Sequence, residues 1–240
     1  LRRAAMLSRL AVTLANSAQP PQAEAPAREA LAVAESEGDE AAIADALNTL
    51  GIVLQGLARY DEAQAVLDRS LALRLRLHGE RSDTVAAVLH NQSLVQRGRG
   101  RPAEAEQLLR RALAVKQAVL PPTHPSRLVS LESLGRVLGE LRRFDEAEAV
   151  LLQVLDLRRQ LYGNDNEKMA SAHNELANVL HDRGRIAQAL PHYREAVRIG
   201  LAVGDQPGVS HAVHLNNLAT ALEDLGRVAE AGEAYRASLA

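Results

Sequence analysis

The stretch RRFDEAEAVL, residues 142 to 151, occurs three times in this chain in closely similar form. RYDEAQAVL occupies residues 59 to 67, and RPAEAEQLL occupies residues 101 to 109. The alanines that follow the glutamate, Ala63, Ala105 and Ala147, are 42 residues apart in the sequence. A motif that returns at a fixed interval of 20–50 residues is typical of a solenoid, in which each copy is one structural unit.

Small residues repeat in register along the whole chain. The alanine of the motif also occurs at Ala231, with variants at Ala23 and Ala189, and two further columns of small or slender residues keep the same interval. These columns are Ala11, Gly51, Ser93, Gly135, Ala177 and Ala219, and Ala30, Ser70, Ala112, Val154, Ala196 and Ser238. Small side chains at fixed positions let packed helices approach to about 8–10 Å. The register therefore predicts six structural units.

Each unit has the apolar spacing of two helices. LNTLGIVLQGL from Leu47 and LESLGRVLGEL from Leu131 show the first helix. A break follows, at which three copies carry Gly100, Gly184 or Gly226, residues that can adopt the left-handed conformation that ends a helix. The other copies carry Ala18, Ala58 and Arg142 there. Asp61, Asp145 or Pro102 then stands near the start of the second helix, where a negative charge or a missing N–H is favourable.

The predicted architecture is all-α, a right-handed superhelical solenoid of stacked antiparallel helix pairs. We expect one solenoid domain over residues 1–240. Its six repeats are expected at about 4–43, 44–85, 86–127, 128–169, 170–211 and 212–240. The chain begins at Leu1 and stops at Ala240 within an incomplete helical pattern, from which we expect it to be part of a longer protein.

Composition excludes several classes of function. A net charge of −2 provides no general attraction to nucleic acid or to anionic membranes. The absence of cysteine excludes a disulfide framework and thiolate chemistry. No apolar run approaches the roughly 20 residues that span a bilayer. The basic and then apolar N-terminus is weakly similar to a signal peptide, but Arg9 interrupts its apolar part, and we expect a cytoplasmic protein.

The repeated residues carry a resemblance. The pattern L-x-x-L-G/A-x-x-L followed by G-R-x-x-E-A-x-x-x-L/Y-x-x-A-L resembles the tetratricopeptide repeat over essentially the whole chain. The unit here is 42 residues rather than the usual 34, and first helices such as HLNNLA and SAHNELA are similar to the kinesin-light-chain type of repeat. That type is also common in bacterial signalling proteins. The resemblance implies a module for binding proteins or peptides rather than an enzyme.

The sequence contains only weak signals for a catalytic or metal site. No phosphate-binding loop motif is present. The stretch RGRGRPAEA has two glycines and arginines that could hold a phosphate, but its place in the repeat explains Gly100 as a helix end. His211 and His214 share a helical face, but no third metal ligand stands at a matching step. Ser171, His173 and Asp182 lie on a predicted rigid helix pair that cannot assemble a triad, and His173 is predicted to be a half-buried packing residue. We expect no enzyme activity, no cofactor and no metal.

In resembling proteins the first helices of the pairs form a concave wall, on which asparagines hydrogen-bond the backbone of an extended peptide. An asparagine amide has two donors and an acceptor, which suit a peptide group whatever its side chain. The resemblance places the following peptide-binding candidates on this wall: Asn48, His90, Asn91, Arg97, Glu132, Arg136, Asn174, Glu175, Asn178, Asp182, Asn216, Asn217 and Glu223.

The charge on this wall predicts what the groove prefers. Its C-terminal half carries Glu132, Glu140, Glu175, Asp182, Glu223 and Asp224 against Arg136 alone, which favours a basic peptide segment. The Lys/Arg set with which other tetratricopeptide domains bind a C-terminal carboxylate is missing.

Alternatives remain open at this point. The chain could bind through its convex face or an end, or act only as a spacer. It could be the regulatory or sensor arm of a bacterial serine/threonine kinase or transcription regulator. It could also be a scaffold that self-associates weakly through uncapped ends.

Overall fold

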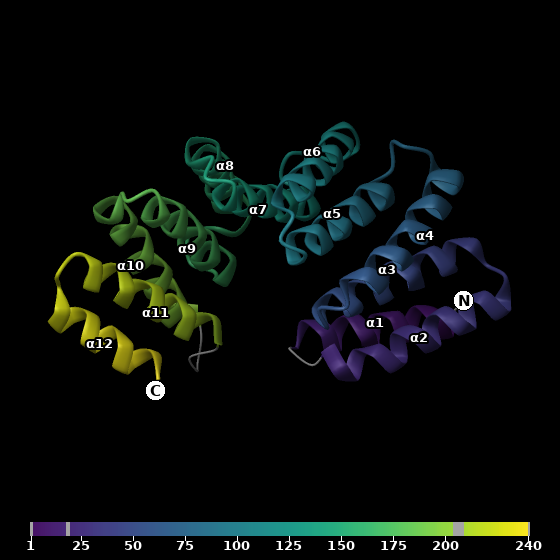
Figure 1. The fold of residues 1–240 in the computed structure, drawn as a ribbon, viewed down its shortest axis with the longest axis horizontal. Helices are drawn as coiled ribbons and strands as arrows, with labels where there is room; N and C mark the ends of the chain where they lie inside the picture. Colours follow the sequence, from purple (N-terminus) through teal and green to yellow (C-terminus); the bar gives the residue numbers. More distant parts are fainter. Residues whose placement is uncertain (1, 18–19, 204–208, 240) are drawn as a thin grey trace. The chain divides into compact units, whose positions relative to one another are not determined.

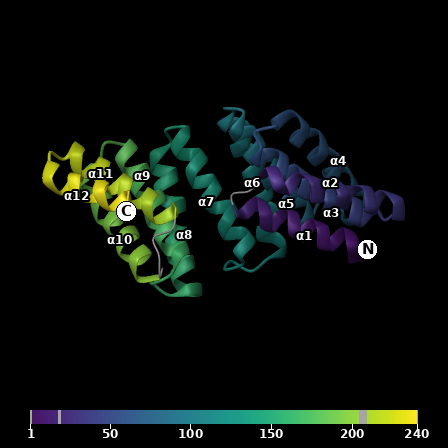
Figure 2. The ribbon, with the colours of Figure 1, turned by 90° about the horizontal axis from the view of Figure 1, so that it is seen from below.

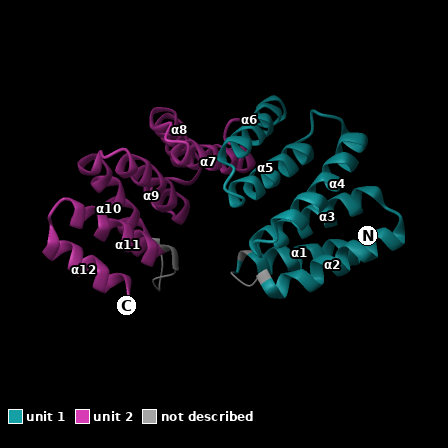
Figure 3. Ribbon diagram, in the orientation of Figure 1, with its two compact units in different colours: residues 1–121 teal, residues 122–240 magenta. Residues whose placement is uncertain are grey.

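The computed structural model describes residues 2–17, 20–203 and 209–239 (Figure 1). Within these ranges the chain forms twelve α-helices and no strand, which confirms the predicted all-α helical repeat. The chain divides into two compact units, residues 1–121 and 122–240 (Figure 3). None of the helices in the described ranges is long and apolar enough to cross a membrane.

Each unit consists of three helix pairs in chain order. Figures 1 and 2 draw these helices in two perpendicular views. The first unit contains α1 (Arg2–Asn16), α2 (Pro20–Glu37), α3 (Glu40–Gly56), α4 (Tyr60–His78), α5 (Asp83–Gly98) and α6 (Pro102–Val119). The second unit contains α7 (Pro125–Glu140), α8 (Phe144–Tyr162), α9 (Glu167–Asp182), α10 (Ile186–Val203), α11 (Val209–Asp224) and α12 (Val228–Ser238). That all six pairs form one continuous solenoid stays a prediction.

The packing defines an inner face in each unit. Within each unit, the second helix of a pair packs against its own first helix and against the first helix of the next pair. First helices also contact each other, α1 with α3 and α3 with α5 in one unit, α7 with α9 and α9 with α11 in the other. In the described parts of the chain, second helices of successive pairs make no such contact. The first helices therefore line the more tightly curved side of each unit.

The small residues lie where helices cross. The alanines of the repeated motif are buried, with Ala63, Ala105 and Ala147 fully inaccessible to solvent. A Cβ atom placed on Gly51 would lie 2.6 Å from the side chain of Leu67, and one on Gly135 would lie 2.7 Å from that of Leu151. Real Cβ atoms do not approach other carbons this closely. In these two pairs the helices are therefore so close together that only glycine fits at the crossing.

Replacing Ala147 with leucine should destabilise the protein by about 1–3 kcal/mol, because the larger side chain overpacks a helix crossing that has no free volume. Ala63→Leu should behave alike, since Ala63 packs in the core with Leu50, Val53 and Leu67. Thermal or chemical unfolding of the two variants checks this, with the exposed Ala41→Leu as control. Unchanged stability in both variants would contradict the assigned repeat register.

Helix ends follow a common geometry. Gly100, Gly184 and Gly226 adopt positive φ angles of 72°, 83° and 73°, as predicted for residues that end the first helix. Ala58 and Arg142 take the same conformation, with φ of 57° and 59°, although they carry a Cβ atom. In each case the next backbone N–H donates to a carbonyl in the last turn, such as Arg59 N to Leu54 O at 2.9 Å. Ala18, the remaining predicted position, lies outside the described residues.

Ala58→Gly is expected to raise the free energy of unfolding by about 0.5–1 kcal/mol. The left-handed conformation costs an L-residue with a Cβ atom roughly 1–2 kcal/mol, and the greater freedom of glycine in the unfolded chain offsets part of this gain. The reverse change at the equivalent position, Gly100→Ala, should lower the free energy of unfolding by a similar amount. Denaturant titration gives the free energy of unfolding of both variants. A change of the same sign in both would contradict the inference that Ala58 and Gly100 end their helices with the same backbone conformation.

Candidate functional site

The predicted wall residues lie on the first helices α3, α5, α7, α9 and α11, which form the inner faces of the units. His90 and Asn174 are the most enclosed of them, at 9% and 6% exposure. Asn216, Asp182 and Glu223 are exposed, and the other candidates are half-buried. The wall is therefore a surface of partly enclosed polar groups.

Asparagine side chains join neighbouring first helices. Asn91 Nδ2 donates to Asn48 Oδ1 at 2.8 Å and links α5 to α3, and Asn217 Nδ2 donates to Asn174 Oδ1 at 3.0 Å and links α11 to α9. Asn178 Oδ1 accepts from the hydroxyl of Tyr193 at 2.8 Å. Each amide in such a bridge retains further donors or acceptors, since an amide has more than one of them. The same asparagines can therefore hold the helices together and present hydrogen-bonding groups.

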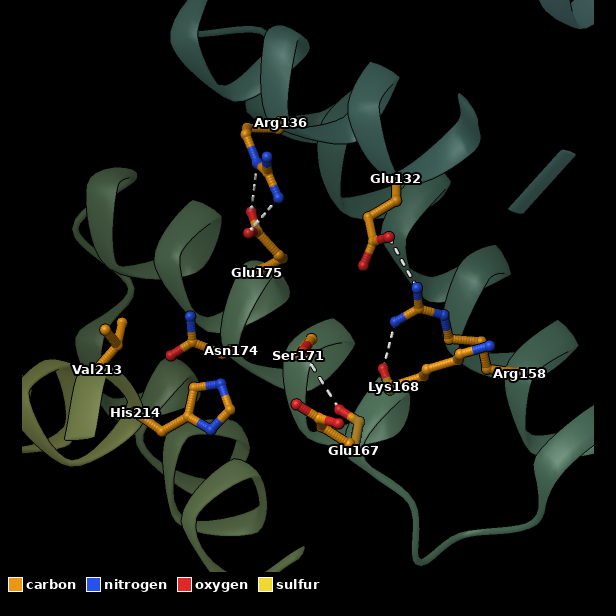
Figure 4. A pocket seen from close by; sticks show the side chains of 10 residues that line it. All are labelled: Glu132, Arg136, Arg158, Glu167, Lys168, Ser171, Asn174, Glu175, Val213 and His214. Atoms are coloured by element: carbon orange, nitrogen blue, oxygen red, sulfur yellow. Dashed lines mark hydrogen bonds and ion pairs between the residues drawn. The ribbon is translucent and has the colours of Figure 1, made fainter. Parts of the chain in front are cut away.

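A pocket of about 500 Å³ opens on the wall of the second unit (Figure 4). It brings together four of the predicted residues, Glu132, Arg136, Asn174 and Glu175. The side chains that complete its lining come from α8, α9 and α11, and they are Arg158, Glu167, Lys168, Ser171, Val213 and His214. The other predicted residues do not line it. Nine of the ten side chains that line the pocket are polar or charged.

Two ion pairs shape the pocket. Arg136 binds Glu175 through Nη2 at 2.6 Å and Nε at 3.2 Å, joining α7 to α9. Arg158 Nη2 binds Glu132 Oε2 at 2.7 Å, and its Nη1 donates to the backbone carbonyl of Lys168 (Figure 4). Burial raises the pKa of Glu132, and the carboxylate of Glu175 adds to this effect while Arg158 opposes it.

These pairs change the expected charge of the site. The sequence-based count set six acidic residues against Arg136 alone, but the structure adds Arg158 and Lys168 to the pocket. Glu132 and Glu175 are both paired with arginine. The acidic side chains that remain exposed lie toward the C-terminal ends of the first helices, at Glu140, Asp182, Glu223 and Asp224. The pocket itself is nearly balanced in charge.

Arg158 is not among the site residues predicted from the sequence, because it lies on a second helix, where a charged side chain is usually exposed to solvent. A signal was nevertheless present. Arg74, Lys116 and Arg158 are 42 residues apart in the sequence and are buried to 6%, 3% and 5% exposure. Arg74 binds Asp45 on α3 at 2.7 Å, just as Arg158 binds Glu132 on α7. Three successive repeats thus direct a basic side chain toward the polar wall.

The first unit has two adjoining hollows on its inner face, of about 490 and 400 Å³. Both include Ser8 and Arg9 of α1, and α3 contributes Asp45 to one and Thr49 to the other. Their lining is small and mostly neutral, so they have fewer groups that could orient a ligand than the pocket of the second unit.

The residues that could suggest catalysis have other roles. Ser171 Oγ donates to the backbone carbonyl of Glu167 at 3.2 Å, and His173 Nδ1 lies 3.0 Å from His192 Nδ1. His173 is half-buried as predicted, and burial lowers its pKa to about 4. In the described ranges, no group of three His, Cys, Asp or Glu side chains is placed to hold a metal ion. Repeats of this kind are generally non-catalytic scaffolds.

Comparison with known proteins agrees with this geometry. One model of the tetratricopeptide repeat matches residues 42–118 and 126–202, and two others match residues 3–37 and 212–237. The clustered mitochondria protein homolog of Meyerozyma guilliermondii is 30% identical over 73 residues. This match covers 30% of the chain and only 6% of that relative's length.

Solved structures share the fold. A putative kinesin light chain of Podosopora anserina with nearly identical TPR-like repeats has a TM-score of 0.70 at 22% identity, covering 80% of this chain and 91% of that one. NprR in complex with its cognate peptide NprX has a TM-score of 0.69 at 11% identity, covering 97% and 65%. Since models of one repeat family match most of the sequence, this chain belongs to the tetratricopeptide repeat family.

Proposed function

We propose that this protein-interaction repeat binds an extended peptide, or an extended segment of a partner protein, along the inner face of its first helices. The pocket of the second unit serves as the anchor. The observation that carries the proposal is the convergence there of Asn174, Arg136, Glu175 and Arg158 around about 500 Å³. NprR, which shares the fold, is solved with its cognate peptide.

The polar groups of the pocket suit a peptide backbone. Asn174 lies beside the Arg136–Glu175 pair and bonds to Asn217, so an amide and two charged groups are held at fixed positions. Such preorganised groups lose little side-chain entropy when a ligand binds. Val213, at 47% exposure, adds an apolar surface for a side chain at the pocket's edge.

A titration of a peptide library with the full chain tests this proposal. The double variant Asn174→Ala, Asn217→Ala should bind the best peptide at least about tenfold more weakly, a loss of roughly 1.4 kcal/mol or more. Asn164→Ala, in the exposed turn between α8 and α9 and outside the predicted wall, is the matched control and should bind within about twofold. Melting curves separate loss of binding from loss of fold. The proposal is wrong if no peptide binds, or if the folded double variant binds like the parent.

A preference for basic segments is the finer part of the proposal, and it now depends on Glu140, Asp182, Glu223 and Asp224 rather than on the pocket. Exposed charge pairs contribute only about 0–1 kcal/mol each, so affinity should be micromolar and should fall as salt rises. Glu140→Lys with Asp182→Lys should weaken a basic peptide and leave an uncharged one unaffected. Changing Glu175 would be a poor test, because it would also break the ion pair that Glu175 forms with Arg136.

The second candidate is a regulatory or sensor arm of a bacterial kinase or transcription regulator. It uses the same peptide site as the first candidate, and NprR, which shares the fold, is solved with its cognate peptide. The sequence that flanks this chain in its gene distinguishes a regulatory arm from a separate interaction module. A kinase or DNA-binding domain there would support the regulatory arm.

A further inference from the structure

The crossing between α4 and α5 in the first unit carries polar side chains where the other repeats carry leucine. Gln92 and Gln96 lie on the side of α5 that faces α4, with Gln92 3% exposed and Gln96 half-buried. The equivalents of Gln92 are Leu10, Leu50, Leu134, Leu176 and Leu218, and those of Gln96 are Leu14, Leu54, Leu138, Leu180 and Leu222. From the second repeat onward all of these leucines are buried.

A chain of hydrogen bonds takes the place of the apolar contact. Gln92 Nε2 donates to Asp68 Oδ1 at 2.7 Å, and Gln96 Nε2 donates to Gln64 Oε1 at 2.9 Å. Gln64 Nε2 in turn donates to the same oxygen of Asp68 at 2.7 Å. Among the described residues, the buried Oε1 of Gln96 has no hydrogen-bond partner. The four side chains thus form one network that ends on the exposed carboxylate of Asp68.

Asp68 departs from the repeat together with its glutamine partners. The residues at the equivalent position of the other repeats are Arg28, Arg110, Leu152, Arg194 and Arg236. An acidic acceptor therefore occurs in this register only where the next first helix presents amide donors. The matched change on both helices makes the network a specific feature of this crossing.

A polar crossing of this kind separates more readily than an apolar one. When the helices move apart, water replaces the lost partner of each amide or carboxylate, so that little free energy is lost per hydrogen bond. A buried leucine has no such compensation, because its apolar surface is transferred to water. Val88 and Val95 still pack in the apolar core of the first unit beside the network. The third helix pair is thus attached to the second less firmly than leucines would attach it.

We propose that the crossing between α4 and α5 is a polar hinge, at which the third helix pair opens from the second while α1 to α4 stay folded. Opening breaks the bonds of Gln92 and Gln96 to α4, and water takes their place. Because Asn91 on α5 bridges to Asn48 on α3, movement at the hinge changes the spacing of these two first helices on the inner face. Such opening requires no ligand in the pocket of the second unit.

Labelling of a single introduced thiol tests the hinge, because the chain has no cysteine of its own and a buried thiol reacts only when its surroundings open. Val95→Cys places the thiol at the hinge. Val53→Cys is the matched control, since it places the thiol at the equivalent position of α3, beside Leu50 and Leu54. Both valines are fully inaccessible to solvent. In the folded full chain, a small disulfide reagent should label Val95→Cys at least tenfold faster than Val53→Cys.

Restoring the leucines of the other repeats should close the hinge. Gln92→Leu combined with Gln96→Leu should slow the labelling of Val95→Cys at least tenfold and change that of Val53→Cys less than twofold. Equal labelling rates for the two thiols, or no slowing by the leucines in a variant whose melting curve shows a folded chain, would overturn the hinge. Equal slowing of both thiols would also overturn it, because the leucines would then stabilise the whole chain.

Asp68 offers a second test that leaves α5 unchanged, since its side chain is exposed and its replacement leaves the core intact. Asp68→Ala removes the oxygen to which Gln92 and Gln64 donate and should speed the labelling of Val95→Cys at least threefold. Asp68→Asn keeps an acceptor oxygen and should stay within twofold of the parent. An alanine variant that is labelled at the parent rate would mean that the network does not hold the crossing closed, which contradicts the hinge.

Discussion

Arg158→Met should lower the free energy of unfolding by about 3–5 kcal/mol, the range for removing one partner of a buried ion pair. The side chains of Arg158 and Glu132 are 7% and 14% exposed, so the substitution leaves a carboxylate enclosed without its cation. It also removes the bond that Arg158 makes to the backbone of Lys168 at the start of α9. Denaturant titration at pH 7 measures the loss.

Two further variants test whether the loss of stability comes from breaking a buried ion pair. Glu132→Leu added to Arg158→Met should recover most of the stability, because an apolar pair of similar volume needs no compensating charge. Arg69→Met should change stability by less than about 1 kcal/mol, since Arg69 and Glu35 are 53% and 41% exposed. A small loss in Arg158→Met, or no recovery in the double variant, would show that water solvates Glu132 despite its burial.

Acid is expected to destabilise the first unit through His90. Burial, with the nearby Lys116, lowers the pKa of His90 to about 4 in the folded chain, against about 6.5 when unfolded. Above pH 6.5 the ring is neutral in both states and the full stability is present. Between pH 6.5 and pH 4 only the unfolded chain takes up the proton, so stability falls, by about 3 kcal/mol in total at 1.36 kcal/mol per pKa unit.

His90→Asn isolates this contribution, because asparagine stands at the equivalent positions Asn48, Asn174 and Asn216. Other histidines of lowered pKa, such as His211 and His214, contribute equally to both proteins and cancel in the difference. Unfolding free energies at pH 7.5 and pH 4.5 should therefore differ less in the variant than in the parent. Equal pH dependence in the two proteins would mean that the His90 ring is solvated.

The polar wall has a structural role as well as the proposed binding role. Asparagine bridges and the Arg136–Glu175 pair connect neighbouring first helices on the wall. A peptide that uses these groups must share them or displace part of the bridging. Binding and local packing of the second unit are therefore coupled, and stability should be measured alongside affinity for every wall variant.

The helix pairs and their boundaries could be predicted from the sequence because they depend on local rules. A 3.6-residue apolar period specifies a helix, and the 42-residue register specifies where small residues must stand, as Gly51 against Leu67 shows. Helix ends at Gly100 and Gly184 follow from the backbone conformation that glycine adopts without strain. Even Ala58 was located as a helix end by register, although its side chain gave no reason for one.

Side-chain partners on the wall were decided only by the tertiary structure. The pairs Arg158–Glu132, Asn217–Asn174 and His192–His173 join residues that are 26, 43 and 19 positions apart. A repeat period predicts that two helices are neighbours, but not how each is rotated about its own axis or which rotamer its long side chains adopt. A rotation of a few tens of degrees would turn Arg158 from Glu132 toward solvent. The sequence alone therefore determined the repeating helix pairs, whereas the charge and shape of the candidate site arose from packing between them.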